Sequence, residues 1–558
     1  MNSVRCLAVA ALYGVTVNSL AMAQTRKPQV PKAPAGCATL QSLEIPKEAL
    51  GLPTGGAVIQ AATEAGVEPA KVYCRVTGWI RPVDPSGLNI NFQVNLPNGW
   101  NHKAVEFGGA GFDGNVVSAT GPAQRGGEPP INRGYVTLGS DSGHSSALGP
   151  TFALNDEAME NYAAGAIKKT HDVAMLLMKA RNGEAPAHFY FAGNSKGGHE
   201  AMMAMQRYPA DFDGIIAFHP VYNFIGTGLA PVQFAKQIFK TDAAGKFPGF
   251  LSRAKGAMLN AAAIEACDEK DGLKDGIISD PGGCRFDLAK LRCPSGGDEG
   301  DKCLSDEQIK SVQTVAGRTD FGFPLRNGVS TLPGYPILEG SDWASNAIGA
   351  SPQDFPPRNG ILTGAQTIQY WIMRDPKADP LKFDPAANWK EVARASAVMD
   401  ANDVDLSRFE ARGGKFILVH GTVDSLVNPY SSIEYFDRLV AQFGRERVNR
   451  FVKFYLVPGF GHGGGFYQQF EAGWDALTAL ENWVEKGTAP ANQVTTDPRS
   501  KKSRPLCEYG MFPKYNGTGD PNAAESFTCA PATIARPQGG RGGPGGGPGR
   551  GPGPGRGQ

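Results

Sequence analysis

Ser195 lies at the centre of Gly193-Asn-Ser-Lys-Gly197, which fits the G-x-S-x-G pattern of a nucleophilic serine. An apolar run at 188–192 precedes it and a helical pattern at 196–208 follows, as this pattern requires. Small glycines let the strand and the helix meet at a sharp turn that presents the hydroxyl. The helix N-terminus behind the serine favours developing negative charge. The pattern predicts a serine nucleophile.

A serine hydroxyl needs a base, because it is a poor nucleophile at neutral pH. Where this turn occurs, an acid and then a histidine follow the serine along the chain. Asp424 follows an apolar run at 415–419, and His462 is the only one of eight histidines beyond it. We therefore expect His462 to be the base and Asp424 to orient it. His199 is nearer to Ser195 in sequence, but we expect a packed or surface residue there.

The oxyanion that forms during acyl transfer needs fixed N–H donors. One donor is expected from the backbone of Lys196, the residue after the nucleophile. A second is expected from the glycine-rich stretch 108–111, which follows an apolar run at 103–107. We favour Gly111 within that stretch. The alternative is that these glycines only permit a tight turn.

An acidic cluster spans Cys267 to Ile277, with carboxylates at Asp268, Asp271 and Asp275. Carboxylates in a loop with glycines suit a hard cation such as calcium. The spacing is not that of an EF-hand, because no glutamate stands at the twelfth loop position. The alternative is an acidic surface loop held by its cysteines.

These residues must be positioned by a sheet, and the apolar pattern predicts one. Strand-like runs alternate with helical patterns, which predicts a mainly parallel sheet covered on both faces. The expected strands lie at 103–107, 134–138, 188–192, 213–218, 415–419 and 452–457, and the expected helices at 156–181, 196–208 and 466–485.

The segment 224–405 breaks this rhythm and is rich in Gly, Pro and Asp, so we expect an inserted lid domain. The catalytic domain would comprise 37–223 and 406–535. Residues 24–36 are rich in Pro and Lys and predict a flexible lead-in. Residues 536–558 are a Gly/Pro/Arg tail that cannot bury a core and should be disordered.

Residues 1–23 have the pattern of a signal peptide: Arg5, an apolar run at 7–17, and Ala21-Met-Ala23. A short membrane anchor is the alternative, although the run is shorter than a span needs. No later stretch predicts a membrane span. We expect a secreted or periplasmic protein. The net charge of +1 indicates no nucleic-acid partner.

Eight cysteines remain after cleavage, an even number that predicts disulfides in an exported chain. A zinc site is the alternative, although no C-x-x-C pair occurs. We expect neighbours in sequence to pair, as Cys37–Cys74, Cys267–Cys284, Cys293–Cys303 and Cys507–Cys529.

The chain resembles the tannase and feruloyl esterase family over most of 40–530. The resemblance is carried by Phe107–Gly114, Asp141–His144, Gly193–Gly198, Arg207–Pro209, Asp213–Ile216, Asp268–Ile277, Gly413–Lys415, His420-Gly421 with Asp424, and Pro458–His462. It implies an α/β-hydrolase fold and a structural calcium ion in the lid. Its implied ligands are the side chains of Asp268, Asp271 and Asp275 and the carbonyls of Leu273 and Ile277.

One departure from that family stands next to the catalytic residues. Members usually carry cysteines before the nucleophile and after the histidine, joined by a disulfide, whereas this chain has Asn194 and Gly463. A hydrogen bond from Asn194 is the expected substitute.

We therefore expect an exported carboxylic ester hydrolase that forms an acyl-enzyme and needs no organic cofactor. The resemblance implies small aromatic ester substrates of the feruloyl, galloyl, hydroxybenzoyl or terephthaloyl type. Stacking on the acyl ring is expected from lid aromatics, and Arg374 is a candidate partner for a substrate carboxylate. The aromatics considered are Phe355, Tyr370, Trp371 and Trp389. A lipase or amidase, or a non-catalytic binding protein, remains an alternative, and nothing in the sequence indicates an oligomeric state.

Overall fold

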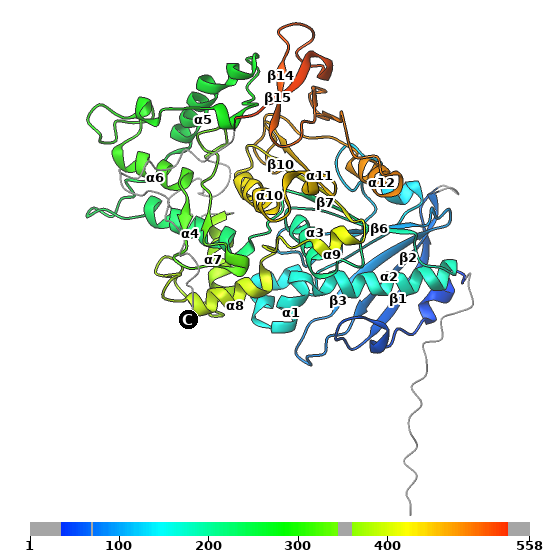
Figure 1. The fold of residues 1–558 in the computed structure, drawn as a ribbon. Helices are drawn as coiled ribbons and strands as arrows, with labels where there is room; N and C mark the ends of the chain where they lie inside the picture. The colour runs from blue at the N-terminus through cyan, green and yellow to red at the C-terminus, as the bar shows by residue number, and fades with distance from the viewer. Residues whose placement is uncertain (1–34, 68–70, 344–359, 534–558) are drawn as a thin grey trace, which may run out of the picture.

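The computed structural model describes residues 35–67, 71–343 and 360–533 (Figure 1). The expected signal peptide, most of the lead-in and the Gly/Pro/Arg tail lie outside these ranges. Ala35 is buried, and its amide donates to Ala180 O at 3.2 Å. The described chain is therefore packed against α2 (Ala166–Asn182) at Ala35, two residues before Cys37.

A nine-stranded sheet forms the centre of the molecule, in the order β1-β2-β3-β5-β4-β6-β7-β10-β11. The six strands from β5 to β11 run parallel, and β1 to β3 are antiparallel. The strands are β1 (Ala57–Ala65), β2 (Tyr73–Ile80), β3 (Ile90–Pro97), β4 (Lys103–Phe107), β5 (Val136–Ser140), β6 (His188–Asn194), β7 (Gly214–Phe218), β10 (Lys415–Gly421) and β11 (Val452–Val457).

All six expected strands are present as the parallel part of this sheet. Side chains alternate between the two faces, so Phe189 and Phe191 of β6 enter one core while Tyr190 and Ala192 enter the other. The antiparallel strands β1 to β3 were not expected. They alternate buried and more exposed residues rather than forming continuous apolar runs.

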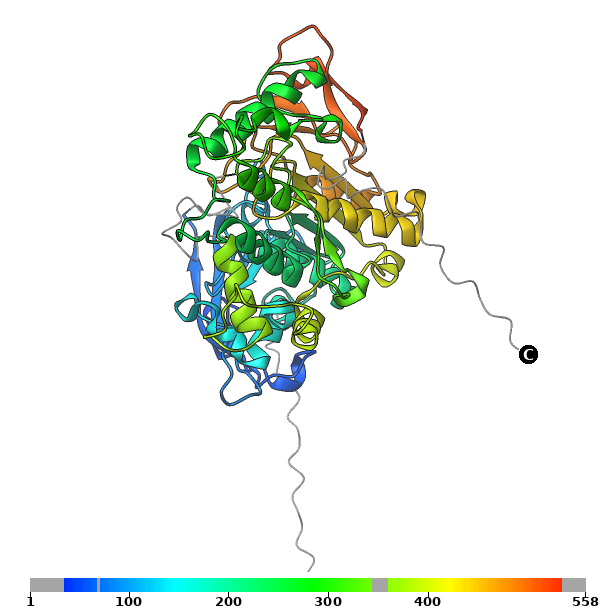
Figure 2. The same cartoon turned by 90° about the vertical axis from the view of Figure 1, so that its left-hand side faces the viewer.

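Helices cover both faces of the sheet (Figures 1 and 2). Side chains of α2, α3 and α10 share one core with the sheet, and those of α12 share the other. The helices of this part are α1 (Asp156–Glu160), α2 (Ala166–Asn182), α3 (Lys196–Arg207), α9 (Ser407–Ala411), α10 (Pro429–Phe443), α11 (Arg445–Asn449) and α12 (Ala476–Lys486). A π-helical turn at Asn161–Gly165 joins α1 to α2.

The expected helix at 466–485 is wrong in its first half, because α12 begins at Ala476. The amides of Gln469 and Phe470 donate to Gly459 O at 2.9 and 3.1 Å, which commits this stretch to the neighbouring loop. Asp475 caps α12 by accepting from Thr478 N.

The lid holds five helices and a short two-stranded sheet among its described residues. They are α4 (Phe224–Ile238), α5 (Arg253–Cys267), α6 (Asp306–Ala316), β8 (Thr319–Asp320), β9 (Thr331–Leu332), α7 (Gly360–Gln366) and α8 (Trp389–Met399). Figure 1 shows this green and yellow-green layer beside the sheet. Its apolar core is continuous with Phe152, Met159 and Tyr162, which precede the lid in the chain. The lid therefore shares one core with the segment around α1.

The C-terminal segment forms two small hairpins, β12 (Val494–Thr496) with β13 (Ser503–Pro505), and β14 (Met511–Tyr515) with β15 (Phe527–Pro531). Figure 1 shows β14 and β15 beside α5 of the lid. Thr533 Oγ1 donates to Asp280 Oδ2 at 2.8 Å, which ties the end of this segment to the lid.

Four disulfides form in the pairing expected from sequence: Cys37–Cys74, Cys267–Cys284, Cys293–Cys303 and Cys507–Cys529. Two of them close loops within the lid, and Cys507–Cys529 fastens the C-terminal hairpins. None of the described helices is long and apolar enough to cross a membrane.

Candidate active site

Ser195 occupies a sharp turn between β6 and α3, with φ +60° and ψ −118°. A left-handed φ is costly for a residue with a side chain, and such strain concentrates at functional positions. A Cβ on Gly193 would lie 2.1 Å from Gly197 O, and one on Gly197 would lie 2.7 Å from Gly109 O. Only glycine therefore fits at the positions two residues before and two residues after the serine.

The structure brings together the three residues expected to form a triad. His462 Nε2 lies 3.0 Å from Ser195 Oγ, and His462 Nδ1 lies 2.8 Å from Asp424 Oδ2. Asp424 and His462 follow β10 and β11, whose carboxyl ends lie at the same edge of the sheet as that of β6. This arrangement allows His462 to take a proton from Ser195 while Asp424 stabilises the imidazolium.

Asp424 is fully buried, and its second oxygen accepts from the amides of Leu426 and Val427, both at 2.9 Å. Burial alone would raise the pKa of Asp424. The His462 charge and the His420 and His462 hydrogen bonds outweigh burial and lower that pKa below its ordinary value. Asp424 therefore stays ionised, as a partner for an imidazolium must.

Two further histidines lie beside the triad. His420 is buried 3.3 Å from Asp424 Oδ2, and its Nδ1 lies 2.8 Å from Ser432 Oγ. His219 Nδ1 lies 2.9 Å from Asn194 Oδ1, and its ring centroid is 5.3 Å from that of His462. Asn194 thus makes the hydrogen bond expected in place of a disulfide, with His219 as its partner.

His199 faces away from the reaction. It is completely buried on α3, and its Nε2 lies 2.6 Å from Met399 O. Burial lowers the pKa of His199 well below its ordinary value, so the ring is neutral and can donate to that carbonyl. It is the packed residue expected from sequence.

The residues of the two expected oxyanion donors both line one cavity. Lys196 is the first residue of α3, so its amide has no intrahelical acceptor. Gly111 has φ +59°, and a Cβ there would meet nothing within 4 Å. Gly111, Ser195 and Lys196 all line the same cavity.

This cavity has a volume of about 130 Å³ and is mainly apolar. Three aromatic residues line it, Phe112 after β4, Phe224 at the start of α4 and Tyr335 from the lid. The other lining residues include Val221, Thr227, Pro231, Leu426 and Val427. Among the described lining residues Lys196 is the only charged one, and its ammonium pairs with Glu200.

Of the aromatics expected to stack on substrate, the three that the structure describes do not line this cavity. Trp371 is buried in the lid core against Phe112 and Phe224, and Trp389 is 52% exposed beside Lys390. Tyr370 does not line the cavity, and Phe355 lies outside the described residues. Arg374 pairs with Asp156 and with Leu154 O, so its expected role toward a substrate carboxylate is not supported.

The acidic loop is a compact turn in which Asp268 and Asp271 are buried. Asp268 Oδ1 accepts from Ile277 N at 3.1 Å, and Asp271 Oδ1 accepts from Leu273 N at 3.0 Å. Burial raises the pKa of both carboxyls, that of Asp271 to about 6, and the charge of Asp275 adds to the shift. Buried carboxylates that repel one another in this way would be stabilised by a bound cation.

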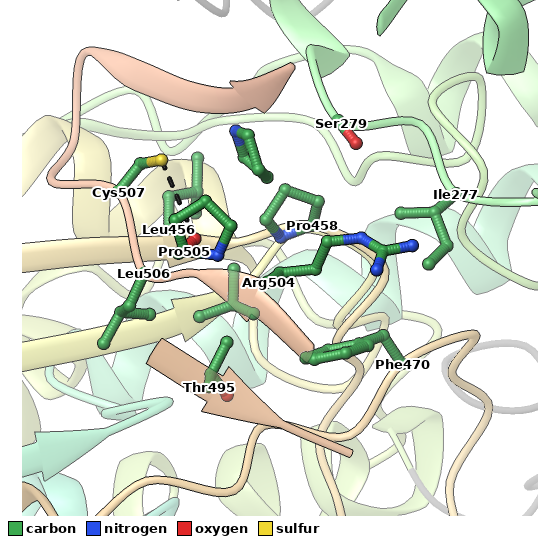
Figure 3. A pocket seen from close by; sticks show the side chains of 12 residues that line it. Ile277, Ser279, Leu456, Pro458, Phe470, Thr495, Arg504, Pro505, Leu506 and Cys507 are labelled. Atoms are coloured by element: carbon green, nitrogen blue, oxygen red, sulfur yellow. Dashed lines mark hydrogen bonds between the residues drawn. The ribbon is translucent and has the colours of Figure 1, made fainter. Parts of the chain in front are cut away.

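Arg504 of β13 also reaches this loop, and Figure 3 shows its side chain extending towards Ile277. Its Nη2 lies 2.7 Å from Asp275 Oδ2. Among the His, Cys, Asp and Glu side chains of the described residues, only His219, Asp424 and His462 bring three ligand atoms within 4.8 Å of one another. The loop carboxylates are thus more widely spread, and Asp275 is paired with an arginine.

Sequence reasoning missed the apolar residues that line the cavity and a buried charged cluster around Lys196. The cluster comprises Asp113, Ser142, Tyr162, Lys196 and Glu200. Asp113 and Ser142 stand in the motifs 107–114 and 141–144, which had served only as marks of resemblance. The concentration of polar residues in these glycine-rich motifs was the signal from which the buried cluster could have been predicted.

Comparison with known proteins places the fold and the family. The family model described as tannase and feruloyl esterase matches residues 74–530. A protein of Agrobacterium fabrum named an uncharacterized esterase is 37% identical over 529 residues, covering 90% of this chain and 94% of that protein. The mono(2-hydroxyethyl) terephthalate hydrolase of Piscinibacter sakaiensis is 29% identical, covering 86% of this chain and 89% of that protein.

Solved structures show the same fold. Feruloyl esterase B from Aspergillus oryzae superposes with a TM-score of 0.73 at 22% identity, covering 88% of this chain and 99% of that one. Tannin acyl hydrolase from Aspergillus niger gives a TM-score of 0.64 at 18% identity, covering 87% and 94%. The expected α/β-hydrolase fold is confirmed.

Proposed function

The chain belongs to the tannase and feruloyl esterase family and is an esterase, and we propose that Ser195, His462 and Asp424 are its catalytic triad. The observation that carries this proposal is the chain of contacts from Ser195 Oγ to His462 at 3.0 Å and from His462 to Asp424 at 2.8 Å.

Ser195 Oγ attacks the ester carbonyl carbon while its proton passes to His462 Nε2. The C=O electron pair moves to the oxygen, which forms the tetrahedral oxyanion. When the C–O bond to the alcohol breaks, His462 gives the proton to the leaving oxygen. Water then repeats these steps on the acyl-enzyme and releases the acid.

The oxyanion is stabilised by backbone donors at Lys196 and Gly111. Both residues line the cavity together with Ser195, and they come from different elements, α3 and the loop after β4. The N-terminus of α3 adds a favourable field for negative charge. Losing one such donor typically costs about 100- to 1000-fold in turnover.

We propose that the cavity holds an uncharged aromatic acyl group. Phe112, Phe224 and Tyr335 give it aromatic walls, which favour an aryl ring. A substrate whose ring also carries a free carboxylate would lose the hydration of that carboxylate without gaining a partner from the described residues that line the cavity. Feruloyl, galloyl and hydroxybenzoyl esters therefore fit this cavity better than a terephthalate monoester.

Acid release from methyl ferulate, methyl gallate and mono(2-hydroxyethyl) terephthalate tests the proposal. We expect the first two to be cleaved with the higher kcat/KM, and Ser195→Ala to abolish cleavage of all three. Full activity of Ser195→Ala would overturn the triad, and a preference for the terephthalate would overturn the uncharged acyl group. Activity that rises with acyl-chain length would instead indicate a lipase.

Calcium binding by the acidic loop is a second part of the proposal. Asp268 and Asp271 are buried acids with raised pKa values, and Asp275 lies in the same turn. The family resemblance implies these side chains, with the carbonyls of Leu273 and Ile277, as ligands. The ion would hold the loop of the lid together and take no part in the chemistry.

Export to the periplasm or medium is the third part. Four disulfides are consistent with an oxidising compartment. The signal-peptide pattern supplies the route, with cleavage after Ala23. N-terminal sequencing of protein from the culture medium or periplasm checks the cleavage site.

A further inference from the structure

A buried ion pair lies directly behind the proposed oxyanion hole. Lys196 Nζ lies 2.8 Å from Glu200 Oε1, one turn further along α3. The two residues are only 2% and 4% exposed. Burying two charges is costly unless further hydrogen bonds satisfy them.

Those further bonds attach the ion pair to the glycine-rich loop after β4. Glu200 Oε2 accepts from Gly109 N at 2.9 Å. The Lys196 ammonium lies 4.1 Å from the ring centroid of Tyr162, whose hydroxyl donates to Gly111 O at 3.1 Å. His144 also holds this loop, independently of the ion pair, with its Nε2 2.6 Å from Phe112 O.

Ser142 couples a second acid to this pair. Its Oγ lies 2.6 Å from Asp113 Oδ2 and 2.9 Å from Glu200 Oε1. A hydroxyl has one proton, so it cannot donate to two carboxylates at once. Ser142 can therefore bond both carboxyls only if one of them is protonated, and Asp113 and Glu200 also share a side-chain hydrogen bond that needs such a proton.

The positions of the neighbours identify the protonated acid as Asp113. Lys196 Nζ is 2.8 Å from Glu200 but 3.5 Å from Asp113, and Gly109 N donates to Glu200 alone. Burial and the Glu200 charge raise the pKa of Asp113 well above its ordinary value. Despite burial, the Lys196 charge lowers the pKa of Glu200. The cluster holds one cation and one anion.

We propose that the Lys196–Glu200 ion pair is the positioning element of the oxyanion hole, fixing the loop 108–112 relative to the Lys196 amide. This inference rests on the proposed serine mechanism. Its physical reason is that the two donors come from separate elements, α3 and the loop after β4. Such donors must hold their positions to about 0.5 Å to stabilise the transition state. Lys196 supplies one donor, and through Glu200 its side chain is linked to Gly109 in the loop that supplies the other donor, Gly111.

Two variants of nearly unchanged shape test whether the Lys196–Glu200 ion pair itself is required, rather than any acid of the buried cluster. Glu200→Gln removes the anion 2.8 Å from Lys196 and leaves Asp113, at 3.5 Å, as the only acid paired with its ammonium. This weakens the link between α3 and the loop, so we expect kcat on methyl ferulate to fall by about tenfold or more. Asp113→Asn replaces one neutral group by another, so we expect a much smaller loss. Equal losses from the two variants, or a native kcat for Glu200→Gln, would overturn the proposal.

A transition-state mimic supplies a readout that a merely structural role would not change. Phenylboronic acid accepts Ser195 Oγ at boron and gives a tetrahedral anion with an oxygen in the oxyanion hole, whereas benzoate resembles the planar product. In Glu200→Gln we expect the inhibition constant of the boronic acid to rise with the loss of kcat, and that of benzoate to stay within about twofold. An unchanged boronic acid affinity would contradict the proposal.

Control variants keep the result interpretable. Lys255→Met removes a buried lid lysine that pairs with Asp298 at 2.8 Å, and it should leave kcat unchanged. If Glu200→Gln does not fold, Tyr162→Phe keeps the ring and removes only the hydrogen bond to Gly111 O, and it should lower kcat several-fold. If Ser195→Ala remains active, the serine mechanism itself fails. If Ser195→Ala is inactive while Glu200→Gln retains full kcat, only the positioning role fails.

Discussion

Asn194 Oδ1 accepts a hydrogen bond from His219 Nδ1 at 2.9 Å, immediately before the nucleophile. His219 packs edge-on against Phe460, and its amide donates to Val419 O at 2.9 Å. The pair therefore joins the end of β6 to the end of β10 and to the loop that carries His462. Asn194 is one of the two positions, with Gly463, at which the family resemblance implies a disulfide, and its partner here is His219 instead.

The first prediction concerns this contact. Asn194→Ala leaves the His219 ring without its partner and should destabilise the fold by about 1 kcal/mol, the usual contribution of a hydrogen bond. Because the ring flanks His462, kcat should fall several-fold with little change in KM. Thermal melting and steady-state kinetics measure both effects. Asn132→Ala, an exposed asparagine outside the site, serves as control, and native kcat in Asn194→Ala would refute the role.

The second prediction concerns Asp424. Asp424→Asn removes the charge that stabilises the His462 imidazolium and should lower kcat by about 10⁴-fold. Labelling by a fluorophosphonate should slow in parallel. Asp437→Asn, an exposed change on α10, should have little effect.

The same carboxyl gives a pH dependence of stability. Its pKa is lower in the folded than in the unfolded chain, so its stabilising contribution is present above the ordinary value near 4 and is lost as pH falls through the folded value. Urea titrations between about pH 3 and 7 should show a smaller acid-side loss of stability in Asp424→Asn than in the native chain. An identical loss would contradict the lowered pKa.

The third prediction concerns the acyl cavity. Val221→Phe should narrow it and raise KM for methyl ferulate by about tenfold or more, because pocket contacts of this size discriminate to that extent. Cleavage of 4-nitrophenyl acetate, which has a small acyl group, should change little. Val494→Phe makes the same substitution at a residue 48% exposed on β12 and should leave both substrates unaffected. Equal effects on both esters would show that the ring does not enter this cavity.

The fourth prediction concerns calcium. Without metal, the raised pKa of Asp271, about 6, means that the folded chain holds its proton more tightly, so stability falls as pH rises from about 4 through 6. Calcium requires the ionised form, so the gain in Tm on adding millimolar calcium should be larger at about pH 7 than at about pH 5.

Asp271→Asn should remove the calcium response without lowering the metal-free Tm, since it also removes a repulsive charge. Glu269→Gln is the matched control, because it is an exposed acid of the same loop outside the expected ligand set. No Tm change with calcium in the native chain would exclude this loop as a calcium site.

The parallel sheet was predictable because β4, β6, β7, β10 and β11 are buried on both faces and read as continuous apolar runs. The strands β1 to β3 were not predicted, because polar residues on a more exposed face interrupt their apolar pattern. The first half of the expected closing helix failed because tertiary bonds to Gly459 outweigh the local helical pattern.

Ser195, Asp424 and His462 could be proposed from sequence because their order and their strand-end positions are constrained. The Lys196–Glu200 cluster could not, because its partners Asp113 and Ser142 lie on other elements that only the fold brings together. The cavity walls were missed for a similar reason. Phe112 and Tyr335 meet there only after the lid has packed on the sheet.

The lid core continues into Phe152, Met159 and Tyr162 without a break. Because the described lid residues and the segment around α1 share this core, replacing the lid by that of another esterase would leave Phe152, Met159 and Tyr162 without their packing partners. Calorimetry should accordingly record one melting endotherm for the lid and the sheet together. New substrate preferences are best sought through single substitutions among the residues that line the cavity.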